Sequence, residues 1–383
     1  MANSTLSNRH ETLFLWDVRK SNPNGDPNGN EPRIDRHTKK CDVTDVCIKR
    51  SVRNYMAVKD GIDSLLVTKL GEDSSQTVTL NERIASYLFN SNKLAGTLKL
   101  IKEVINGRLN IDKDSYKTFL GKPLSENLKK LLDEMGDKKT KDMVIGDVSA
   151  EIILKDIIDA LRAHLCGIFK DLRMFGSVLA LKGNLEILGG PLTGPVQIEV
   201  GTSLHRVVQS NKQITSVMGS KEEKEAGIIG DTHCIEYGLF ATSAIANENA
   251  ARFTGLTDTD HGEFLKALWR GIRDRHTRSK NQVPRLLIDI EYNKPFHFGD
   301  LVNSVKLNPV ERNGRPLEEE AYRSIDDFTL ALACFYKKVN TREAIINSIE
   351  FASNGLITME QFRQELNANL KNKVTEVTDI DFD

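Results

Sequence analysis

The hydrophobic pattern near the N-terminus predicts a strand that leads into a long polar loop. Thr12 to Val18 (TLFLWDV) is rich in strand-forming residues and alternates between apolar and polar positions. Residues 21–30 (SNPNGDPNGN) follow, a run of turn-forming residues that contains Pro-Asn-Gly twice. A strand delivering an extended loop is therefore expected at the start of the fold.

A helix is expected to begin next, with residues 46–56 (VCIKRSVRNYM). Thr44 is a suitable N-cap, and Asp45 places a negative charge in the first turn, where the helix dipole favours it. On a helical wheel one side is apolar and carries Ile48, Val52 and Tyr55. An adjoining arc of about 100° carries the cations Lys49, Arg50 and Arg53.

The composition changes between about Gly61 and Asp147. This part is rich in Lys and Leu, poor in aromatic residues and only weakly periodic, which favours an inserted, mostly helical subdomain. Residues 151–170 then show an apolar stripe at helical spacing, and residues 174–181 return to a strand pattern.

The second half of the chain repeats these signals. A strand is expected at 196–200, and the polar, lysine-rich segment 202–234 with two short β-like patches favours a protruding hairpin. Further strands are expected over 234–246 and 284–292, with a helix over 257–272 between them. The strand at 284–292 alternates apolar and polar positions as a half-buried strand does. The order approximates β-α-β-β-α-β, an α+β pattern of the ferredoxin-like type that RNA-recognition motifs use.

The remaining residues, 293–383, are expected to add helical segments and an acidic tail. Thr358 and Gln361 form the sequence signature of a capping box at the start of one such helix.

Composition narrows the class of protein. The 383 residues include 53 Lys and Arg and 54 Asp and Glu, so the formal net charge of −1 excludes a histone-like polycation. The five cysteines are scattered and form no C-x-x-C pair, which argues against a disulfide framework and a structural zinc site and favours a reducing compartment. The polar N-terminus lacks the apolar core of a signal peptide, and no stretch approaches the roughly 20 apolar residues that cross a bilayer. A cytoplasmic protein without a membrane partner is expected.

The near-neutral total conceals two cationic segments. Residues 270–285 contain six basic residues and one acid, and the helix at 46–56 carries the three cations described above. Both segments can neutralise phosphates, the usual source of affinity for nucleic acid. The alternative is a solvated helix face, but two such runs on adjoining elements favour a function.

The strand at 174–181 opens with a second candidate contact. Met174 and Phe175 precede Gly176, a residue that lets a backbone or a ligand approach closely. Exposed, the two side chains can stack on bases, whereas buried they are core residues. The pattern leaves both interpretations open.

Enzymatic chemistry has little support in the sequence. His164 with Cys166, and His233 with Cys234, are too few for a zinc set, and no hydrolase, P-loop or metalloprotease motif occurs. Three acids around the first loop, Asp17, Asp26 and Asp35, can bind a divalent metal or position a ribose 2′-hydroxyl for cleavage. Acids in a loop of this composition more often form turns.

Six separated stretches occur in an order that is specific to one family: NPNGDP at 22–27, PRID at 32–35, VTDVCIKRSVRNY at 43–55, RMFG at 173–176, LTGPVQ at 192–197 and YGLFATSAIANENAARFTGLT at 237–257. Together they resemble the backbone subunit of CRISPR Cascade complexes, the major crRNA-binding subunit of the RAMP superfamily. The stretches ENAARFTGLT and ALWRGIRDRHTRSK resemble its type I-B branch.

The resemblance implies an RRM-like palm with two insertions. The palm comprises residues 1–60, 148–201 and 235–293, the helical fingers 61–147, the thumb hairpin 202–234, and a C-terminal helical extension packed on the palm 294–383. The RNA-binding positions that it implies are Lys49, Arg50 and Arg53 on the first helix, the turn of Met174, Phe175, Gly176 and Ser177, Met218 as the thumb residue that displaces a base, Arg19, Lys20 and Asn24 at the first loop, and Arg278 and Lys280 near the last strand.

The implied partners are the crRNA, target DNA, further copies of the chain arranged head to tail, and the other Cascade subunits. Those subunits are the one that caps the crRNA 5′ end, the crRNA-processing endonuclease, and the small and large subunits. No cofactor, catalytic residue or metal ligand is implied. Whether such a complex serves defence or transposon-guided insertion stays open, because the backbone subunit is alike in both.

Two rival hypotheses remain. One is a metal-dependent RNA-cleaving relative of the type III backbone subunits, with Asp26 or Asp35 in its active loop. The other is a monomeric RRM-type RNA-binding protein outside any complex.

Overall fold

The computed structural model describes residues 4–68, 78–89, 96–97, 99–100, 147–215, 229–277 and 280–377. The chain divides into two compact units. The first comprises Met1–Tyr55, Val196–Glu248 and Thr257–Asp383, and the second Met56–Pro195 and Asn249–Leu256. The expected α+β class is confirmed, with a central sheet and several helices.

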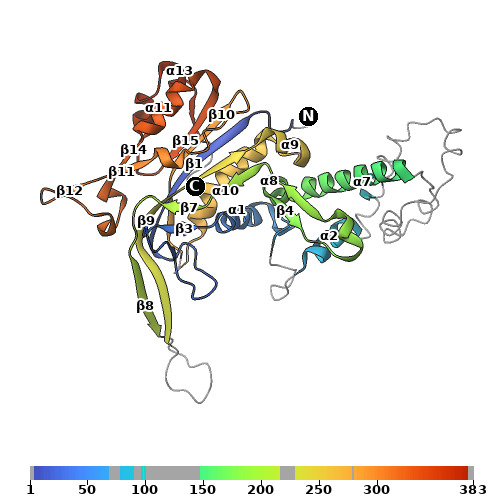
Figure 1. The fold of residues 1–383 in the computed structure, drawn as a ribbon, viewed down its shortest axis with the longest axis horizontal. Helices are drawn as coiled ribbons and strands as arrows, with labels where there is room; N and C mark the ends of the chain where they lie inside the picture. Colours follow the sequence, from blue (N-terminus) through green and yellow to red (C-terminus); the bar gives the residue numbers. More distant parts are fainter. Residues whose placement is uncertain are drawn as a thin grey trace, which may run out of the picture. The chain divides into compact units, whose positions relative to one another are not determined.

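The first unit is built on a 10-stranded sheet (Figure 1). Its principal strand order is β16-β15-β10-β1-β9-β7-β3-β2, and β6 and β8 also pair with β9. The bounds are β1 Arg9–Ser21, β2 Arg33–Ile34, β3 Cys41–Val43, β6 Val196–Ile198, β7 Gly201–Ser203, β8 Gln209–Thr215, β9 Ile229–Ala246, β10 Gln282–Tyr292, β15 Ile346–Ser353 and β16 Val374–Glu376. The strand β1 lies between β10 and β9 and is antiparallel to both.

The central strands are buried on both faces, so the half-buried strand expected at 284–292 is wrong in this respect. In β1, Leu13 and Leu15 pack into a core with the C-terminal segment, while Phe14 packs edge-on to Trp269 on the opposite face. In β10 the polar position Asp289 is only 2% exposed. The alternation predicted which residues share a face, but the layers that cover each face come from distant parts of the chain.

Two helices, α1 (Asp45–Asp60), whose residues 45–55 belong to the first unit, and α10 (Asp258–Asp274), match the expected helices. In α1 the apolar side is buried, with Ile48 and Val52 at 0% exposure. The helix α10 begins with a capping box in which Thr257 and Asp260 satisfy each other's backbone N–H groups. The helix α1 begins where expected, and α10 ends two residues beyond the expected range of 257–272.

The C-terminal segment is not only helical. It contains the helices α11 Ala333–Thr341, α12 Met359–Gln364 and α13 Ala368–Lys371, and the strands β11 Lys306–Pro309, β12 Glu311–Arg312, β13 Arg315–Pro316 and β14 Phe328–Ala331. It also contributes β15, antiparallel to β10, and β16, parallel to β15, to the central sheet. The capping box at Thr358 and Gln361 is confirmed. The helical extension was therefore an incomplete prediction, because short strands at a sheet edge carry little local signal.

A hairpin of β8 and the first half of β9 extends from the sheet (Figure 1), within the segment expected to form a thumb. Its register runs from Gln209 opposite Ile235 to Thr215 opposite Ile229. Met218 lies outside the described residues.

The second unit holds α2 (Leu80–Phe89), α7 (Asp147–Ile168), α8 (Lys170–Phe175) and the hairpin of β4 (Gly176–Leu179) and β5 (Gly190–Thr193). One core joins side chains of α2 and α7, among them Leu88, Leu161 and Leu165. Residues 148–195, expected in the palm, thus belong to this unit, and most of the expected fingers insertion lies outside the described residues. Across the described ranges, no helix combines the length and apolar character needed to cross a bilayer.

Candidate nucleic-acid interface

The basic side of α1 is partly accessible to solvent, and Ile48 and Val52 on the apolar side are buried. Arg50 is exposed, and Lys49 and Arg53 are half-buried. The ammonium group of Lys49 lies 2.9 Å from the carboxylate of Asp45 one turn earlier, which holds the lysine along the helix. The helix that carries the three cations is confirmed, whereas their contact with RNA stays a prediction.

The C-terminal half of α10 packs directly against α1 and brings the second cationic segment beside the first. A Cβ atom on Gly271 would lie 2.4 Å from the carbonyl oxygen of Ser51, so the glycine permits this close approach. The guanidinium of Arg270 donates to the Tyr55 hydroxyl at 3.3 Å, and that of Arg275 approaches Cys47 Sγ at 3.3 Å and Ser51 Oγ at 3.4 Å. We call α1 residues 45–55, α10 residues 270–275 and Lys280 the cationic cluster.

Lys280 holds the first loop rather than projecting into solvent. Its ammonium group donates to the carbonyl oxygens of Asn22 and, at 2.9 Å, Pro23. Burial, together with the charge of Arg275, lowers the pKa of Lys280 to about 8. The sequence analysis included Lys280 among the predicted RNA contacts. In the structure, Lys280 instead fixes the loop after β1 through these two hydrogen bonds. Its contact with RNA stays a prediction.

Replacing Lys280 with methionine is expected to loosen residues 22–31. The substitution removes two hydrogen bonds from a charged donor, each worth about 1.5–3 kcal/mol. Hydrogen exchange of the loop amides, including Asp26 N–H that donates to Glu31 O, should accelerate at neutral pH. Lys39→Met, which changes an exposed lysine of the neighbouring turn, serves as the control. Equal exchange in both variants would contradict the role given to Lys280.

Asn24 connects the loop to the start of α1. Its carboxamide oxygen accepts from Thr44 N–H at 2.9 Å and from the Thr44 hydroxyl at 2.8 Å. The Thr44 hydroxyl in turn accepts from Cys47 N–H at 3.3 Å, which confirms the predicted N-cap. Arg19 and Lys20 are exposed at the end of β1, where Lys20 adopts a positive φ of 48°. Their contact with RNA, and that of Asn24, stays a prediction.

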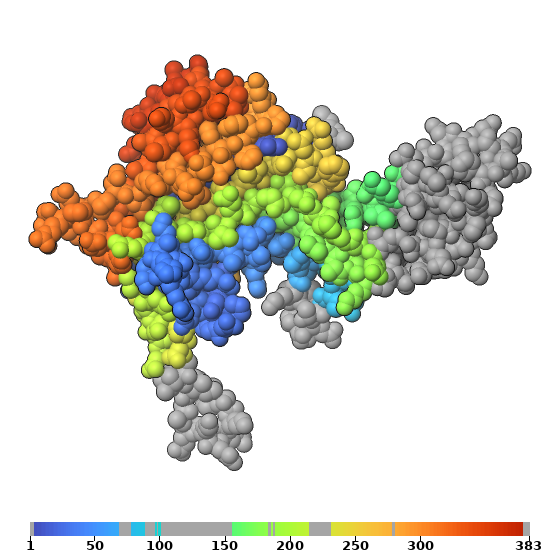
Figure 2. All heavy atoms as spheres, viewed as in Figure 1, coloured from blue at the N-terminus to red at the C-terminus, as the bar shows by residue number. Residues whose placement is uncertain are grey.

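The loop after β1 and the neighbouring 35–40 turn both lie against the base of the β8–β9 hairpin. His233 Nδ1 lies 3.9 Å from a carboxylate oxygen of Glu31 in the loop, and Val207 N–H donates to Lys39 O in the turn at 2.9 Å. Figure 2 shows the blue loop and the yellow-green hairpin base side by side on the surface of this unit. The loop thus joins the cationic cluster to the hairpin.

The acids of the first loop form turns. Asp26 accepts from the N–H groups of Gly29 and Glu31, and these backbone bonds lower its pKa. Asp35 accepts from the backbone and side chain of Thr38 and from His37 N–H, and its pKa is lowered for the same reason. Asp17 pairs with Arg285 at 2.9 Å. Within the described ranges, the one group of three potential metal ligands is His10, His261 and Asp289, away from these turns.

The turn at 174–177 lies in the second unit and is largely buried. Met174 is 0% exposed and Phe175 6%, so neither presents an exposed face for stacking on a base. Residues 174 and 175 close the helix α8, and the strand begins only at Gly176, whose φ of 66° ends that helix. Stacking by Met174 and Phe175 is therefore not supported. A contact of Gly176 or half-buried Ser177 with RNA stays a prediction.

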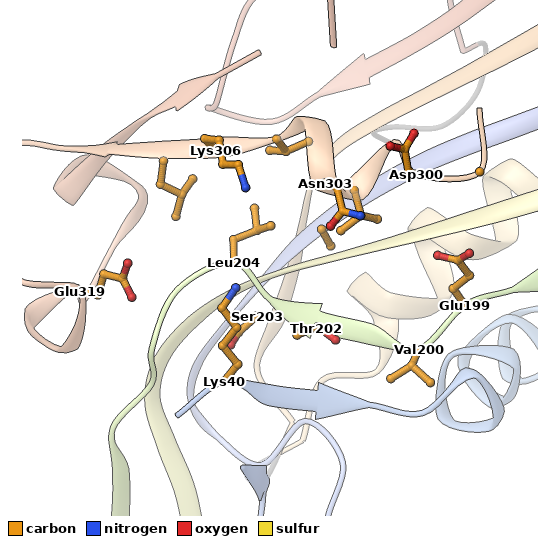
Figure 3. Close-up of a pocket in the computed structure, with 15 residues that line it drawn as sticks. Lys40, Glu199, Val200, Thr202, Ser203, Leu204, Asp300, Asn303, Lys306 and Glu319 are labelled. Atoms are coloured by element: carbon orange, nitrogen blue, oxygen red, sulfur yellow. The ribbon is translucent and has the colours of Figure 1, made fainter. Parts of the chain in front are cut away.

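A pocket of about 530 Å³ lies beside β7 and is lined in part by Thr202 and Ser203 of this strand (Figure 3). The ammonium groups of Lys40 and Lys306 point toward each other across Leu204 in it. Its lining also contains the carboxylates of Glu199, Asp300 and Glu319, so acids outnumber lysines. This charge is unsuited to a phosphate backbone, which favours the cationic cluster as the interface. Arg278, a predicted contact, lies outside the described residues.

The family model described as CRISPR-associated protein Cas7 matches residues 8–333. The chain belongs to the Cas7 family. A Cas7 protein from Haloferax volcanii is 27% identical over 365 residues, which cover 90% of this chain and 86% of that protein. The resemblance seen in the sequence is thus confirmed at the level of the family.

Two solved structures are similar at lower identity. A chain of a CRISPR RNA-guided surveillance complex in a pre-nicking state has 15% identity and a TM-score of 0.47, with 91% of this chain and 94% of that chain covered. A chain of a second CRISPR RNA-guided surveillance complex has 12% identity and a TM-score of 0.41, with 91% and 90% covered.

The Cas7 family match includes the whole cationic cluster. The sequence showed that segment 270–285 is basic, but it did not identify Arg270 or Arg275 as individual site residues. Their places against Tyr55 and Cys47 depend on the packing of α10 on α1. The small residue Gly271, opposite an apolar helix side, was the available signal.

Proposed function

We propose that this chain is a guide-RNA-binding backbone subunit of a CRISPR surveillance complex. The observation that carries the proposal is the cationic cluster in a Cas7-family chain, where cations from two separated segments meet on adjoining helices. Guide complexes leave sequence reading to base pairing, so the protein needs phosphate neutralisation and a rigid support for the RNA rather than base-specific side chains. Both are features of this part of the molecule.

The first unit acts as an RRM-like palm in this proposal. Its four central strands lie in the order β10, β1, β9 and β7, each antiparallel to its neighbours. The helix α1 follows β1 and its loop, and α10 follows β9. This connectivity is that of a split βαβ fold and supports the assignment. Lys49, Arg50 and Arg53 then contact RNA phosphates, with Arg270 and Arg275 beside them.

The remaining parts of the chain take the roles that the family resemblance implies. The β8–β9 hairpin is the thumb, which folds over the RNA and displaces a base with Met218, and residues 61–147 are the fingers near target DNA. Copies associate head to tail along one crRNA and meet the subunits at its ends, the endonuclease that processes it, and the small and large subunits. A head-to-tail contact does not close on itself, so the RNA length sets the copy number. The stretches ENAARFTGLT and ALWRGIRDRHTRSK support the type I-B branch.

The geometry of the first loop supports a non-catalytic role. The two acids that a cleaving relative would use, Asp26 and Asp35, are engaged by backbone N–H groups of their own turns. Such bonds are sufficient to explain both residues without a reaction.

Complementary RNA should remain intact when it is incubated with the assembled complex and Mg²⁺. The reason is that the described loop places its acids in turns rather than in a shared metal site. Gel analysis of the labelled RNA is the measurement, with the complex carrying Asp35→Ala as the matched control. Regularly spaced cuts that disappear in Asp35→Ala would assign cleavage to this loop and overturn the non-catalytic role.

A further inference from the structure

A buried polar cluster lies at the opposite end of β1 from the first loop. It joins His10 of β1, His261 of α10 and Asp289 of β10, three elements of the first unit. Asp289 Oδ2 lies 2.7 Å from His10 Nδ1 and 3.0 Å from His261 Nε2, and the two imidazole centroids are 4.0 Å apart. The exposed fraction of the side chain is 13% for His10, 4% for His261 and 2% for Asp289. These residues play no part in the proposed interface.

The charge around this cluster is strongly negative. Asp289 lies directly opposite Glu350 on β15. The negative charges of Asp289, Glu291 and Glu350 all raise the pKa of His10. The positive charge of Lys266, on α10, counteracts the rise in the pKa of Glu350. The carboxylates of Asp289, Glu291 and Glu350 therefore face one lysine and two imidazoles, and Asp258 of α10 adds a fourth negative charge near His261. Asp289 is only 2% exposed, so an uncompensated charge on it is expensive. A bound cation of charge two would balance the excess.

We propose that His10, His261 and Asp289 bind a divalent transition-metal ion of the Zn²⁺ type. Two imidazoles and one carboxylate are a ligand set that zinc accepts, and their ligand atoms all lie within 4.8 Å of one another. Tetrahedral zinc sets ligand atoms about 3.3 Å apart, given metal–ligand bonds of about 2.0–2.2 Å. Binding therefore releases the protons on the two ring nitrogens to solvent and moves Asp289 Oδ2 slightly away from both nitrogens, which now lie 2.7 and 3.0 Å from it. Water, or the half-buried Glu350 beside Asp289, supplies the fourth position.

A supporting residue orients the carboxylate. The hydroxyl of Thr12, 1% exposed, donates to the other oxygen of Asp289 at 2.6 Å and leaves Oδ2 directed at the two imidazoles. Hydrogen bonds of this kind to a ligating carboxylate fix its direction and raise metal affinity. The ion would bind the sheet to the start of α10, the helix whose other end carries Arg270 and Arg275. Zinc would thereby stabilise the unit that presents the cationic cluster.

The competing account is a triad held together by protons alone. In it Asp289 accepts hydrogen bonds from both imidazoles and from Thr12, and the short distances are those of hydrogen bonds. A metal site binds added Zn²⁺ saturably, whereas a triad held by protons alone does not. One titration therefore distinguishes the two accounts.

The test uses the full-length protein, first depleted of metal by a chelator and then titrated with Zn²⁺ in a calorimeter. We expect one saturable ion per chain, a thermal midpoint that rises with Zn²⁺, and a tetrahedral ligand-field spectrum with Co²⁺. Saturable binding should be lost in His261→Asn and in His10→Asn, and Thr12→Val should weaken it about 10–100-fold. His37→Gln, which changes an exposed histidine of the 35–40 turn, should bind as the unaltered chain does.

The outcomes that overturn the proposal are equally specific. Absence of saturable Zn²⁺ binding by the folded protein would show that the triad holds protons only. Binding that persists at one ion per chain in His10→Asn would place the ion elsewhere. If His261→Asn does not fold, as circular dichroism would reveal, His10→Asn and Thr12→Val decide the matter, because His10 lies at the edge of the cluster and Thr12 is not a ligand.

Discussion

Replacing Lys49 and Arg53 together with alanine is expected to weaken guide-RNA binding by more than about 1 kcal/mol and to lower its salt dependence. The two residues are half-buried on α1, next to Arg270 of α10 and Arg275 at its C-cap. Each lost phosphate contact reduces the slope of log affinity against log salt by about 0.7 for single-stranded RNA. Binding curves at several salt concentrations measure both effects.

The matched control is Lys294→Ala with Lys337→Ala, which removes the same charge from exposed positions of the C-terminal segment. Near-normal affinity and slope are expected for this pair, since neither residue belongs to the cationic cluster. An unchanged slope in the α1 variant would remove this helix from the RNA path. Equal losses in both variants would mean that binding depends on total charge rather than on the cluster.

Gly176→Ala is expected to destabilise the second unit by about 3 kcal/mol or more. Gly176 has a φ of 66°, a conformation that costs a residue with a Cβ atom energy in itself. That Cβ would also lie 2.0 Å from Leu192 O and 2.4 Å from Gly194 N, both backbone atoms of the paired segment. Denaturant unfolding of the variant, followed by limited proteolysis to locate the loss, is the measurement.

Gly167→Ala is the control in the same unit. It lies in α7 with nothing within 4 Å of the added Cβ, so alanine should be neutral or stabilise the helix by up to about 1 kcal/mol. A stable Gly176→Ala protein would show that the turn tolerates a side chain. In that case the glycine would have to be explained by approach of a ligand rather than by approach of Leu192.

Local signals predicted the elements that they control. The strand β1, the helices α1 and α10 and the strand β10 carry strong periodicity and identifiable caps, and each was expected within a few residues of its observed bounds. The failures occur where distant segments decide. Residues 174–175 read as strand but close a helix. The strands β15 and β16 depend on β10, a strand outside the C-terminal segment, for their place in the sheet.

The same distinction applies to the site. The basic segments around 49–53 and 270–285 were visible as charge, and their nearness follows from the expected order of elements. The sequence could not predict the hydrogen bonds of Lys280 to two carbonyl oxygens, because they depend on the path of a loop 258 residues away in the chain. The cluster of His10, His261 and Asp289 was missed for this reason also, since His10 and Asp289 are 279 residues apart and no motif spacing joins them.

The central claim is that many copies of this chain assemble along one guide RNA. Native mass spectrometry of complexes formed on guide RNAs of increasing length tests it most directly. The account predicts that the number of copies rises in proportion to the length of the RNA, because a head-to-tail contact continues until the RNA ends. A single copy per RNA at every length would contradict the account and favour a monomeric RNA-binding protein.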